Sequence, residues 1–410
     1  MIRHCPGEKI RAAARALLML TLAFALISGL PVFSPVHISS YAAAVSPPSA
    51  QSAGTAAASD TSGKADPVRA EADRLLSSMT LSEKIAQMMV VSMPEDNAAK
   101  VQSKYQFGGY ILFARDFSGI SKSRFKKKLK ACQKASDTGM LICVDEEGGT
   151  VVRASYYRSF RSEQFRSPRQ VFGDGGYPAI TVDTKKKDKF LRSLGINCNL
   201  APVADVSYSR YDFIYRRAPS NSVRRASKIV RRIVKQMSRD KVVSCVKHFP
   251  GYGNNGDTHG RVIRDRRSKF TFITRDLRPF SEGIEAGADM IMVSHTIVNA
   301  FDKKNPASLS KKVNKYIRKN MGFDGVVITD GLGMAGVTRF AGNDQGEAAV
   351  RAVKAGNDMI CATGDYESCF KSVKYAVKHG RISRKQIDDS VRRILIMKIR
   401  RGIIKTERIK

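Results

Sequence analysis

The densest group of chemically capable residues lies between Lys247 and Gly260. These fourteen residues include two histidines, a lysine, an aspartate and four glycines. An imidazole can give up a proton and take one back near neutral pH, and a nearby carboxylate such as Asp257 can orient His259. Glycines allow the loop after a strand to fold over whatever the strand end binds. The segment indicates a proton-transfer site, provided that Asp257 and His259 share a tight or extended loop.

Two further segments place carboxylates directly after apolar runs. A carboxylate at the end of a buried strand, such as Asp330, loses hydration unless something pairs with it, and its position favours a reactive role over a structural one. In Val144–Arg153, three acidic residues precede a pair of glycines that lets the backbone approach a ligand. Such acids can accept hydrogen bonds from sugar hydroxyls. Metal sites for hard cations gather more carboxylates than this loop supplies, and we expect neither a metal nor a cofactor.

The elements that must position these residues follow an alternating pattern. Short runs that are apolar on both parities indicate strands covered on both faces, as in parallel sheets. Eight such runs are present: 88–92, 109–113, 140–145, 196–202, 242–249, 290–295, 325–330 and 358–362. Stretches of helical character lie between or around them: 67–79, 122–138, 221–239, 279–286, 311–320, 346–354 and a closing helix at 387–404. The pattern predicts an α/β fold, a (β/α)8 TIM-type barrel.

A barrel of this kind assembles its active site at the carboxyl ends of its strands. The polar residues at or just after the predicted strand ends are therefore the candidates for chemistry. They are Asp145 to Glu147, Asp205, Lys247, His248, His295 and Asp330. Nothing in the pattern remains for a second domain, so we expect one catalytic domain over residues 67–410.

The N-terminal residues are typical of an export signal. Four basic side chains accompany an apolar run from Ala16 to Leu30, with small residues near a cleavage point before Val45. We interpret residues 1–44 as a signal peptide, with an uncleaved membrane anchor as the alternative. Residues 45–66 are mostly Ala, Ser, Pro, Gly and Thr, a composition that cannot order itself, and we expect a disordered spacer there. The protein is then secreted or associated with the cell envelope.

The chain is strongly cationic, with a net charge of +34 that falls only to +31 without residues 1–44. Such a field concentrates polyanions, and an anionic cell wall is the partner we expect for an exported protein. The basic residues are scattered, and no zinc finger, basic zipper or RNA-binding motif is present, so we expect no specific nucleic acid partner. We also expect a monomer. Six cysteines follow the signal, four of them inside apolar runs, and we predict mostly buried thiols.

The catalytic segments resemble the exo-β-N-acetylglucosaminidase branch of glycoside hydrolase family 3, and the resemblance extends from about Pro67 to the C-terminus. In that branch a K-H-F-P-G stretch precedes a loop with D-[ST]-H, and a later S/T-D-x-L-x-M segment supplies the nucleophile. These features stand here as Lys247–Gly251, Asp257–His259 and Thr329–Met334. The resemblance implies that Asp330 is the nucleophile and that His259, oriented by Asp257, is the acid/base.

The resemblance also implies a set of sugar-binding residues. Asp145 and Arg153 stand in a D-x-E-G-G-x-V-x-R pattern, and Lys247 and His248 join them. A further sugar-binding arginine of the family lies thirty residues before the lysine, where this chain has Arg217. The surrounding residues differ from the usual I-G-x-R-S-F, which leaves the adjacent Arg216 as the alternative.

The loop before Asp257 also departs from the branch. It carries Tyr252 where the branch commonly has histidine, and it is one residue shorter. Both residues of the predicted proton-transfer pair are nevertheless present.

The expected reaction is exo-acting, retaining hydrolysis of terminal β-linked N-acetylglucosamine from cell-wall, peptidoglycan-derived glycans through a covalent glycosyl-enzyme. A β-glucosidase or β-xylosidase of the same family would share the barrel and Asp330. A β-N-acetylglucosaminide phosphorylase is a further alternative, because a histidine in place of a carboxylate makes attack by phosphate tolerable. A non-catalytic wall-binding protein would keep the cationic surface but would not need Asp257, His259 and Asp330.

Overall fold

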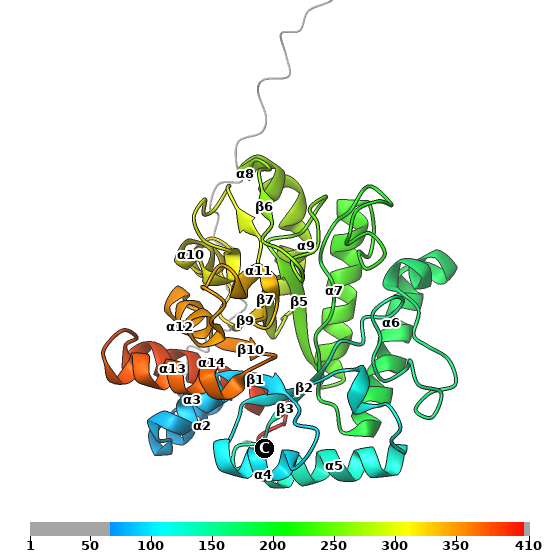
Figure 1. Ribbon diagram of the computed structural model, residues 1–410. Coiled ribbons are helices and arrows are strands. Elements are labelled where there is room, and N and C mark those ends of the chain that lie inside the picture. Colours follow the sequence, from blue (N-terminus) through cyan, green and yellow to red (C-terminus); the bar gives the residue numbers. More distant parts are fainter. Residues whose placement is uncertain (1–65, 406–410) are drawn as a thin grey trace, which may run out of the picture. The chain divides into compact units, whose positions relative to one another are not determined.

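Eight parallel strands form a closed barrel in the computed structural model, which describes residues 66–405 (Figure 1). The order around the barrel is β1-β10-β9-β7-β5-β4-β3-β2. Their bounds are β1 Met89–Ser92, β2 Gly109–Leu112, β3 Leu141–Val144, β4 Cys198–Asn199, β5 Val243–Phe249, β7 Met290–Val293, β9 Val326–Gly331 and β10 Met359–Ala362. The predicted (β/α)8 barrel is confirmed. The predicted signal peptide and nearly all of the predicted spacer lie outside the described residues.

The strands are buried on both faces, as their continuous apolar runs require. All residues of β2, β3, β5, β7 and β10 are buried. The prediction for 196–202 was too long, because regular pairing in β4 covers only Cys198–Asn199. Pro202 has no N–H to donate to a ladder, and the chain there pairs with β5 only through scattered bonds such as Lys247 N to the Pro202 carbonyl.

The helices lie outside the barrel and begin and end where the sequence supplies caps. Serine side chains accept an N-terminal backbone N–H at α5, α6, α7, α10 and α14. Glycine in the left-handed conformation ends α12 at Gly356. The helices on the outer wall are α2 Pro67–Ser78, α3 Leu81–Gln87, α4 Ala98–Tyr105, α5 Lys122–Lys134, α6 Pro168–Leu194, α7 Val223–Arg239, α9 Arg278–Glu285, α10 Lys311–Lys319, α12 Gln345–Ala355, α13 Tyr366–Lys378 and α14 Arg384–Arg400. Shorter pieces are α8 Lys269–Thr271 and α11 Ala335–Thr338, and a small second sheet pairs β6 Arg264–Asp265 with β8 Ile297–Val298.

Four of the outer helices were not predicted, namely α3, α4, α6 and α13. The longest of these, α6, contains three glycines and Pro178, which weaken any helical pattern. The backbone leaves helical geometry at Gly175 and Gly176, so α6 consists of two helices joined by a kink. Asp66, the last residue of the predicted spacer, caps α2, because its carboxylate accepts the N–H of Val68.

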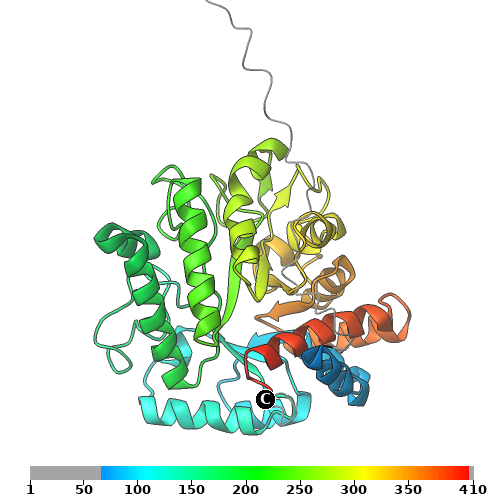
Figure 2. The ribbon, with the colours of Figure 1, turned by 180° about the vertical axis from the view of Figure 1, so that it is seen from behind.

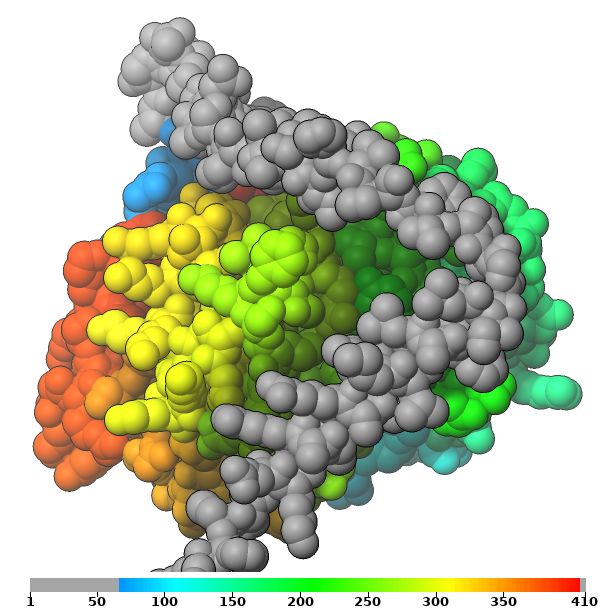
Figure 3. All heavy atoms as spheres, turned by 90° about the horizontal axis from the view of Figure 1, so that it is seen from above, coloured from blue at the N-terminus to red at the C-terminus, as the bar shows by residue number. Residues whose placement is uncertain are grey.

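The first and last helices close the barrel by packing on each other. Figures 1 and 2 both place α14 against α2, and Arg392 of α14 binds Asp73 of α2. Viewed from the top of Figure 1, the surface colours pass from green through yellow to orange and red around the molecule, as expected for elements that succeed one another round a barrel (Figure 3). None of the helices within residues 66–405 is long and apolar enough to cross a membrane.

Several polar or reactive side chains are buried in the interior of the protein. The six cysteines between Cys132 and Cys369 are buried free thiols, as predicted. The side chain of Lys398 is fully buried and donates to the Gln87 side chain and the Gly139 carbonyl, and its burial lowers the pKa to about 7. These bonds tie α14 to α3 and to the turn that enters β3.

Candidate active site

The polar residues predicted to do chemistry come from several strand ends and their following loops. Asp145 directly follows β3, and Lys247 and His248 lie in the last part of β5. Asp330 lies near the end of β9. Because all strands of the barrel are parallel, these positions share its carboxyl-terminal face, where TIM-barrel enzymes carry their active sites.

Lys247 is the central cation of the site. Its ammonium lies 2.6 Å from Asp145 Oδ1 and 2.7 Å from Glu147 Oε1, and its side chain is only 2% exposed. Burial opposes the charge on the ammonium, but the carboxylates of Asp145 and Glu147 outweigh it and raise the pKa of Lys247. The lysine therefore stays charged and holds two carboxylates of the β3 loop at the end of β5.

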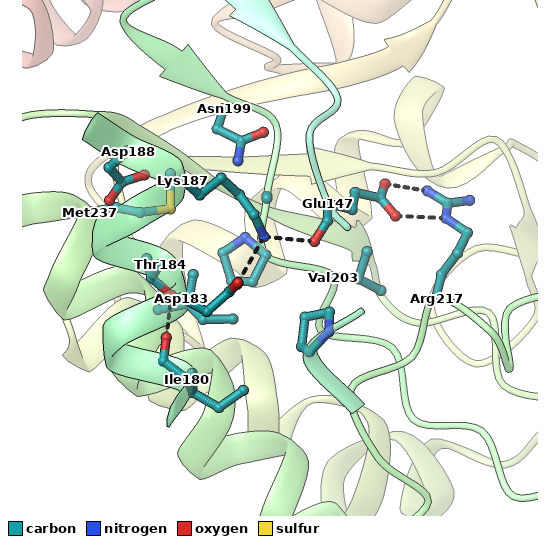
Figure 4. Close-up of a pocket in the computed structure, with 14 residues that line it drawn as sticks. Glu147, Ile180, Asp183, Thr184, Lys187, Asp188, Asn199, Val203, Arg217 and Met237 are labelled. Carbon is teal, nitrogen blue, oxygen red and sulfur yellow. Dashed lines mark hydrogen bonds and ion pairs between the residues drawn. The ribbon is translucent and has the colours of Figure 1, made fainter. Parts of the chain in front are cut away.

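Glu147 links the lysine to Arg217. The guanidinium of Arg217 donates two parallel hydrogen bonds to Glu147, at 2.9 and 2.7 Å (Figure 4). Burial disfavours a charged Glu147, yet Arg217 and Lys247 outweigh it and hold the pKa of this carboxyl well below its usual range. Arg217 is therefore joined to Lys247 through Glu147, whereas the alternative, Arg216, is exposed.

His248 is fixed between a donor and an acceptor. Arg217 Nη2 lies 2.9 Å from His248 Nε2, and Asp205 Oδ2 lies 2.8 Å from His248 Nδ1. A guanidinium can only donate, so Nε2 accepts and the ring proton of His248 resides on Nδ1, where Asp205 accepts it. The buried carboxylate of Asp205 also accepts the backbone N–H of His248 and of Tyr252, which locks the turn after β5.

Asp330 is a partly buried carboxylate that accepts the N–H of Gly331 at 2.8 Å. Burial opposes its ionisation, but His248, His295 and the Gly331 N–H outweigh it and hold the pKa of Asp330 below the ordinary value. His295 is fully buried, with Nε2 donating to the Gly331 carbonyl at 3.0 Å and Nδ1 facing Ser308 Oγ at 2.7 Å. Burial lowers the pKa of His295, and the hydrogen bond from its Nε2 fixes the backbone beside Asp330.

Glu146 has a structural role in the loop after β3. The buried side chain of Glu146 accepts the backbone N–H groups of Arg153, Ala154 and Ser155 and holds this loop together. The loop needs its glycines, because a Cβ on Gly148 would lie 2.2 Å from a backbone oxygen and its φ is +98°.

Arg153 reaches Asp145 at 4.0 Å, and its buried Nε has no hydrogen-bond partner within residues 66–405. Arg153 and Asp145 thus retain donor and acceptor capacity that a ligand could use.

The predicted proton-transfer pair is formed in the loop after β5. Asp257 Oδ1 lies 2.5 Å from His259 Nδ1 and also accepts the His259 backbone N–H at 2.9 Å. The two side chains are 42% and 63% exposed, respectively. With Nδ1 turned to the carboxylate, Nε2 of His259 is the nitrogen that can exchange a proton with a ligand.

This loop is fastened to the segment that follows β9. The N–H groups of Ala335 and Gly336 donate to the carbonyls of His259 and Thr258, each at 3.0 Å. From the other side, the Tyr252 hydroxyl lies 2.7 Å from the buried Thr258 hydroxyl. A Cβ on Gly336 would lie 2.6 Å from the Thr258 carbonyl, so this approach requires glycine. The loop bearing His259 is therefore held to the segment that follows the strand carrying Asp330.

A small cavity of about 20 Å³ lies behind the Glu147–Arg217 pair, between the barrel wall and helices α6 and α7 (Figure 4). Lys187 of α6 donates to the Glu147 carbonyl and pairs with Asp183 at its edge. None of Asp145, His248 and Asp330 lines it. This cavity therefore borders the network that holds Glu147 and is separate from Asp145, His248 and Asp330.

Sequence reasoning left several supporting residues without a role. Glu147, Asp205 and His295 were recognised as polar residues at strand ends, but their partners were not. Tyr252 and Thr258 were noted only as parts of the loop. No spacing rule in the sequence connects the partners of these hydrogen bonds. The one signal was Tyr252, which stands where the branch commonly carries a histidine.

Comparison with known proteins agrees with this arrangement. The model of the glycosyl hydrolase family 3 N-terminal domain matches residues 80–397. A secreted glycosyl hydrolase of Arthroderma benhamiae is 31% identical over 322 residues, which cover 75% of this chain and 89% of the relative. A β-hexosaminidase of Methylococcus capsulatus is 31% identical over 259 residues, or 62% of this chain and 74% of the relative.

A solved structure extends the comparison. The family 3 β-N-acetylglucosaminidase of Paenibacillus sp. FPU-7 superposes with a TM-score of 0.73 at 30% identity, covering 79% of this chain and 63% of that one. The barrel, the strand-end carboxylates and these matches lead to one conclusion. The chain belongs to glycosyl hydrolase family 3 and is a glycoside hydrolase.

Proposed function

We propose that the protein is an exo-acting, retaining β-N-acetylglucosaminidase that removes terminal β-linked N-acetylglucosamine from cell-wall glycans. One observation carries the proposal: the Asp257–His259 pair lies on a loop that is bonded to the segment following Asp330. A carboxylate with a low pKa and a proton carrier are the two groups that retaining hydrolysis requires. The names of the Methylococcus and Paenibacillus relatives support the choice of sugar.

The charged network beside Asp330 would bind the terminal sugar. The partly exposed carboxylate of Asp145 and guanidinium of Arg153 suit hydroxyl groups. Lys247 is held by Asp145 and Glu147, and Arg217 is held by Glu147, so little reorganisation is needed when sugar binds. His248 and its neighbours would orient the ring with its anomeric carbon toward Asp330.

In the first step, an Asp330 oxygen forms a bond to the anomeric carbon while the bond to the leaving oxygen breaks. The leaving oxygen takes the proton from His259 Nε2, and Asp257 stabilises the imidazolium before transfer. In the second step, His259 takes a proton from water as the water oxygen attacks the anomeric carbon. The bond between the anomeric carbon and Asp330 breaks as the bond to the water oxygen forms, and the sugar leaves with its anomeric configuration retained.

The decisive experiment is a substrate panel. Aryl N-acetyl-β-glucosaminide should be cleaved with a higher kcat/KM than the matching aryl β-glucoside and β-xyloside. Equal or faster cleavage of the glucoside would contradict the proposed sugar and favour the β-glucosidase or β-xylosidase alternative. Initial release of the α-anomer, followed by NMR, would contradict retention.

Phosphorolysis is the second candidate, and the identity of His259 favours considering it. An imidazole in place of a carboxylate does not repel an incoming phosphate. Product analysis with and without inorganic phosphate separates the two reactions. Hydrolysis gives free N-acetylglucosamine at the same rate in both, whereas phosphorolysis gives the sugar 1-phosphate and accelerates with phosphate.

A further inference from the structure

A second surface carries a strong charge pattern away from the strand ends. Helix α7 contains seven arginine or lysine residues and no aspartate or glutamate between Val223 and Arg239. Its apolar residues face the barrel, so most of the basic side chains are exposed. Like charges on one helix face repel each other, and this arrangement is stabilised when an anion lies against it.

The exposed face of α7 forms one wall of a groove with α6. Figures 1 and 2 show the two helices side by side on the outside of the barrel. Tyr177 and Thr181 of α6 line the groove opposite the basic residues of α7, and the hollow measures about 430 Å³. Lys228 and Arg232 lie over the Tyr177 ring, 5.7 and 5.3 Å from its centroid.

Most of the groove's charge is not neutralised by the protein. Arg231 pairs with Glu282 and Glu285 of α9. Lys228, Arg232, Lys235 and Arg239 form no ion pair within residues 66–405. The second basic groove, near α10, differs because Glu347 binds two of its arginines. The cations between α6 and α7 are thus available to a ligand.

The spacing of these cations suits a linear polymer. Lys228, Arg232, Lys235 and Arg239 succeed one another at intervals of four, three and four residues. At 1.5 Å per residue their positions rise by about 4.5 to 6 Å per step and span about 17 Å. A single small anion would meet only one or two of them, whereas a chain with one charge per repeat can meet all four.

We propose that the α6–α7 groove binds a linear phosphodiester polymer of the polyol phosphate type found in cell walls. Nucleic acid fits less well, because Tyr177 is the single aromatic residue that lines the groove, so no row of aromatic rings is present on which successive bases could stack. A membrane surface fits less well, because the groove is concave and no exposed large aliphatic side chain lines it. The groove retains the enzyme at the cell wall, and this role is independent of the catalytic assignment.

The test compares two variants that lose the same charge. One combines Arg232→Gln, Lys235→Gln and Arg239→Gln in the groove, and the control combines Lys311→Gln, Lys312→Gln and Lys315→Gln on α10. Binding of fluorescent poly(glycerol phosphate) is measured by anisotropy at several salt concentrations. The groove variant should bind about ten- to a hundred-fold more weakly, with a shallower salt dependence, and the control should change less than about two-fold.

Further arms keep the result interpretable. The pair Arg232→Lys and Arg239→Lys preserves charge and should preserve binding, while both triple variants should keep wild-type activity on a soluble aryl glycoside. An equal loss of polymer binding in both triple variants would overturn the proposed groove site and would indicate attraction by the net charge of the protein. Tighter binding of oligo(dT) or of phosphatidylglycerol vesicles than of the polymer would overturn the assigned partner.

Discussion

Asp330 combines a low pKa with a position at the end of a barrel strand. Its carboxylate is held ionised beside the rings of His248 and His295 and by the Gly331 N–H. An ionised carboxylate that is poorly hydrated is a competent nucleophile toward an anomeric carbon.

Replacing Asp330 by alanine should therefore abolish turnover without unfolding the barrel. We expect kcat to fall by about 10³-fold or more, because the covalent step is lost. Added azide should restore part of the activity by attacking from the vacated side, and the product should be the α-glycosyl azide. A variant that retains activity, or a β-glycosyl azide product, would contradict a nucleophilic role. Circular dichroism of the variant serves as the control for folding.

His259 and Asp257 should act as one unit, since the carboxylate binds the imidazole nitrogen that faces away from the ligand. Either single replacement by alanine should lower kcat/KM by about 10²- to 10⁴-fold on substrates with poor leaving groups. The double variant should be little worse than the more damaged single variant.

A leaving-group series separates this role from a structural one. A good aryl leaving group needs little protonation, so the His259→Ala defect in the first step should shrink markedly there. A defect that is independent of leaving-group pKa and that follows thermal stability would leave the proton-transfer role without support.

At the scale of elements, the loop after β5 must be held over the site. Burial and, after it, the charge of Asp330 raise the pKa of Tyr252, so its hydroxyl stays protonated and can bind Thr258. This bond acts on His259 through the backbone, which makes Tyr252 a positioning residue.

Tyr252→Phe should lower kcat/KM about five- to fifty-fold on poor leaving groups, because the buried Thr258 hydroxyl loses its partner. Thr258→Val should have a similar effect, and the double variant should add little to it. Good leaving groups should be affected much less. Equal losses across the series, together with a lower Tm, would indicate a general loss of stability instead.

The contact between α6 and the end of α7 should make stability depend on pH. Asp188 is fully buried in α6, and burial followed by the nearby Asp240 raises its pKa to about 8. The folded state therefore holds a proton that the unfolded chain releases near pH 4. The free energy of unfolding should fall as pH rises from about 4 to about 8.

Asp188→Asn should remove this loss, so the Tm difference from the wild type should be larger at pH 8 than at pH 5 and should favour the variant at pH 8. Asp240→Asn should weaken the same pH dependence by removing the neighbouring charge. Asp174→Asn, which changes an exposed carboxylate of α6, is the matched control. Parallel Tm profiles for all four proteins would refute the assignment.

At the scale of the whole molecule, the net charge of +34 should act on substrates through its long-range field. For wall fragments that carry carboxylates, kcat/KM should fall about ten-fold between about 20 mM and about 500 mM NaCl, because salt screens the attraction. A neutral aryl glycoside should respond little over the same range. Equal salt effects on both substrates would contradict attraction by charge. Secretion, the wall partner and the monomeric state remain predictions at this scale.

Local patterns in the sequence determined the barrel and the places where its active site must lie. A strand buried on both faces has to be apolar along its length, and a helix has to stop where glycine or a cap permits, so β3, β5 and β9 could be found from neighbouring residues alone. Where such patterns are weak, prediction failed. Glycines and a proline hid α6, and Pro202 shortened β4.

The tertiary structure decided which charges meet. Glu147 binds Arg217 seventy residues away, and His248 is fixed by Asp205 forty-three residues before it. No periodicity links such positions, because an ion pair depends on distances between segments that come together only when the barrel closes. The same holds for the Tyr252–Thr258 bond, for the proton held by Asp188 and for the groove between α6 and α7. Each arises where two surfaces pack, and the physical effect of each, whether on a pKa or on charge density, exists only at that contact.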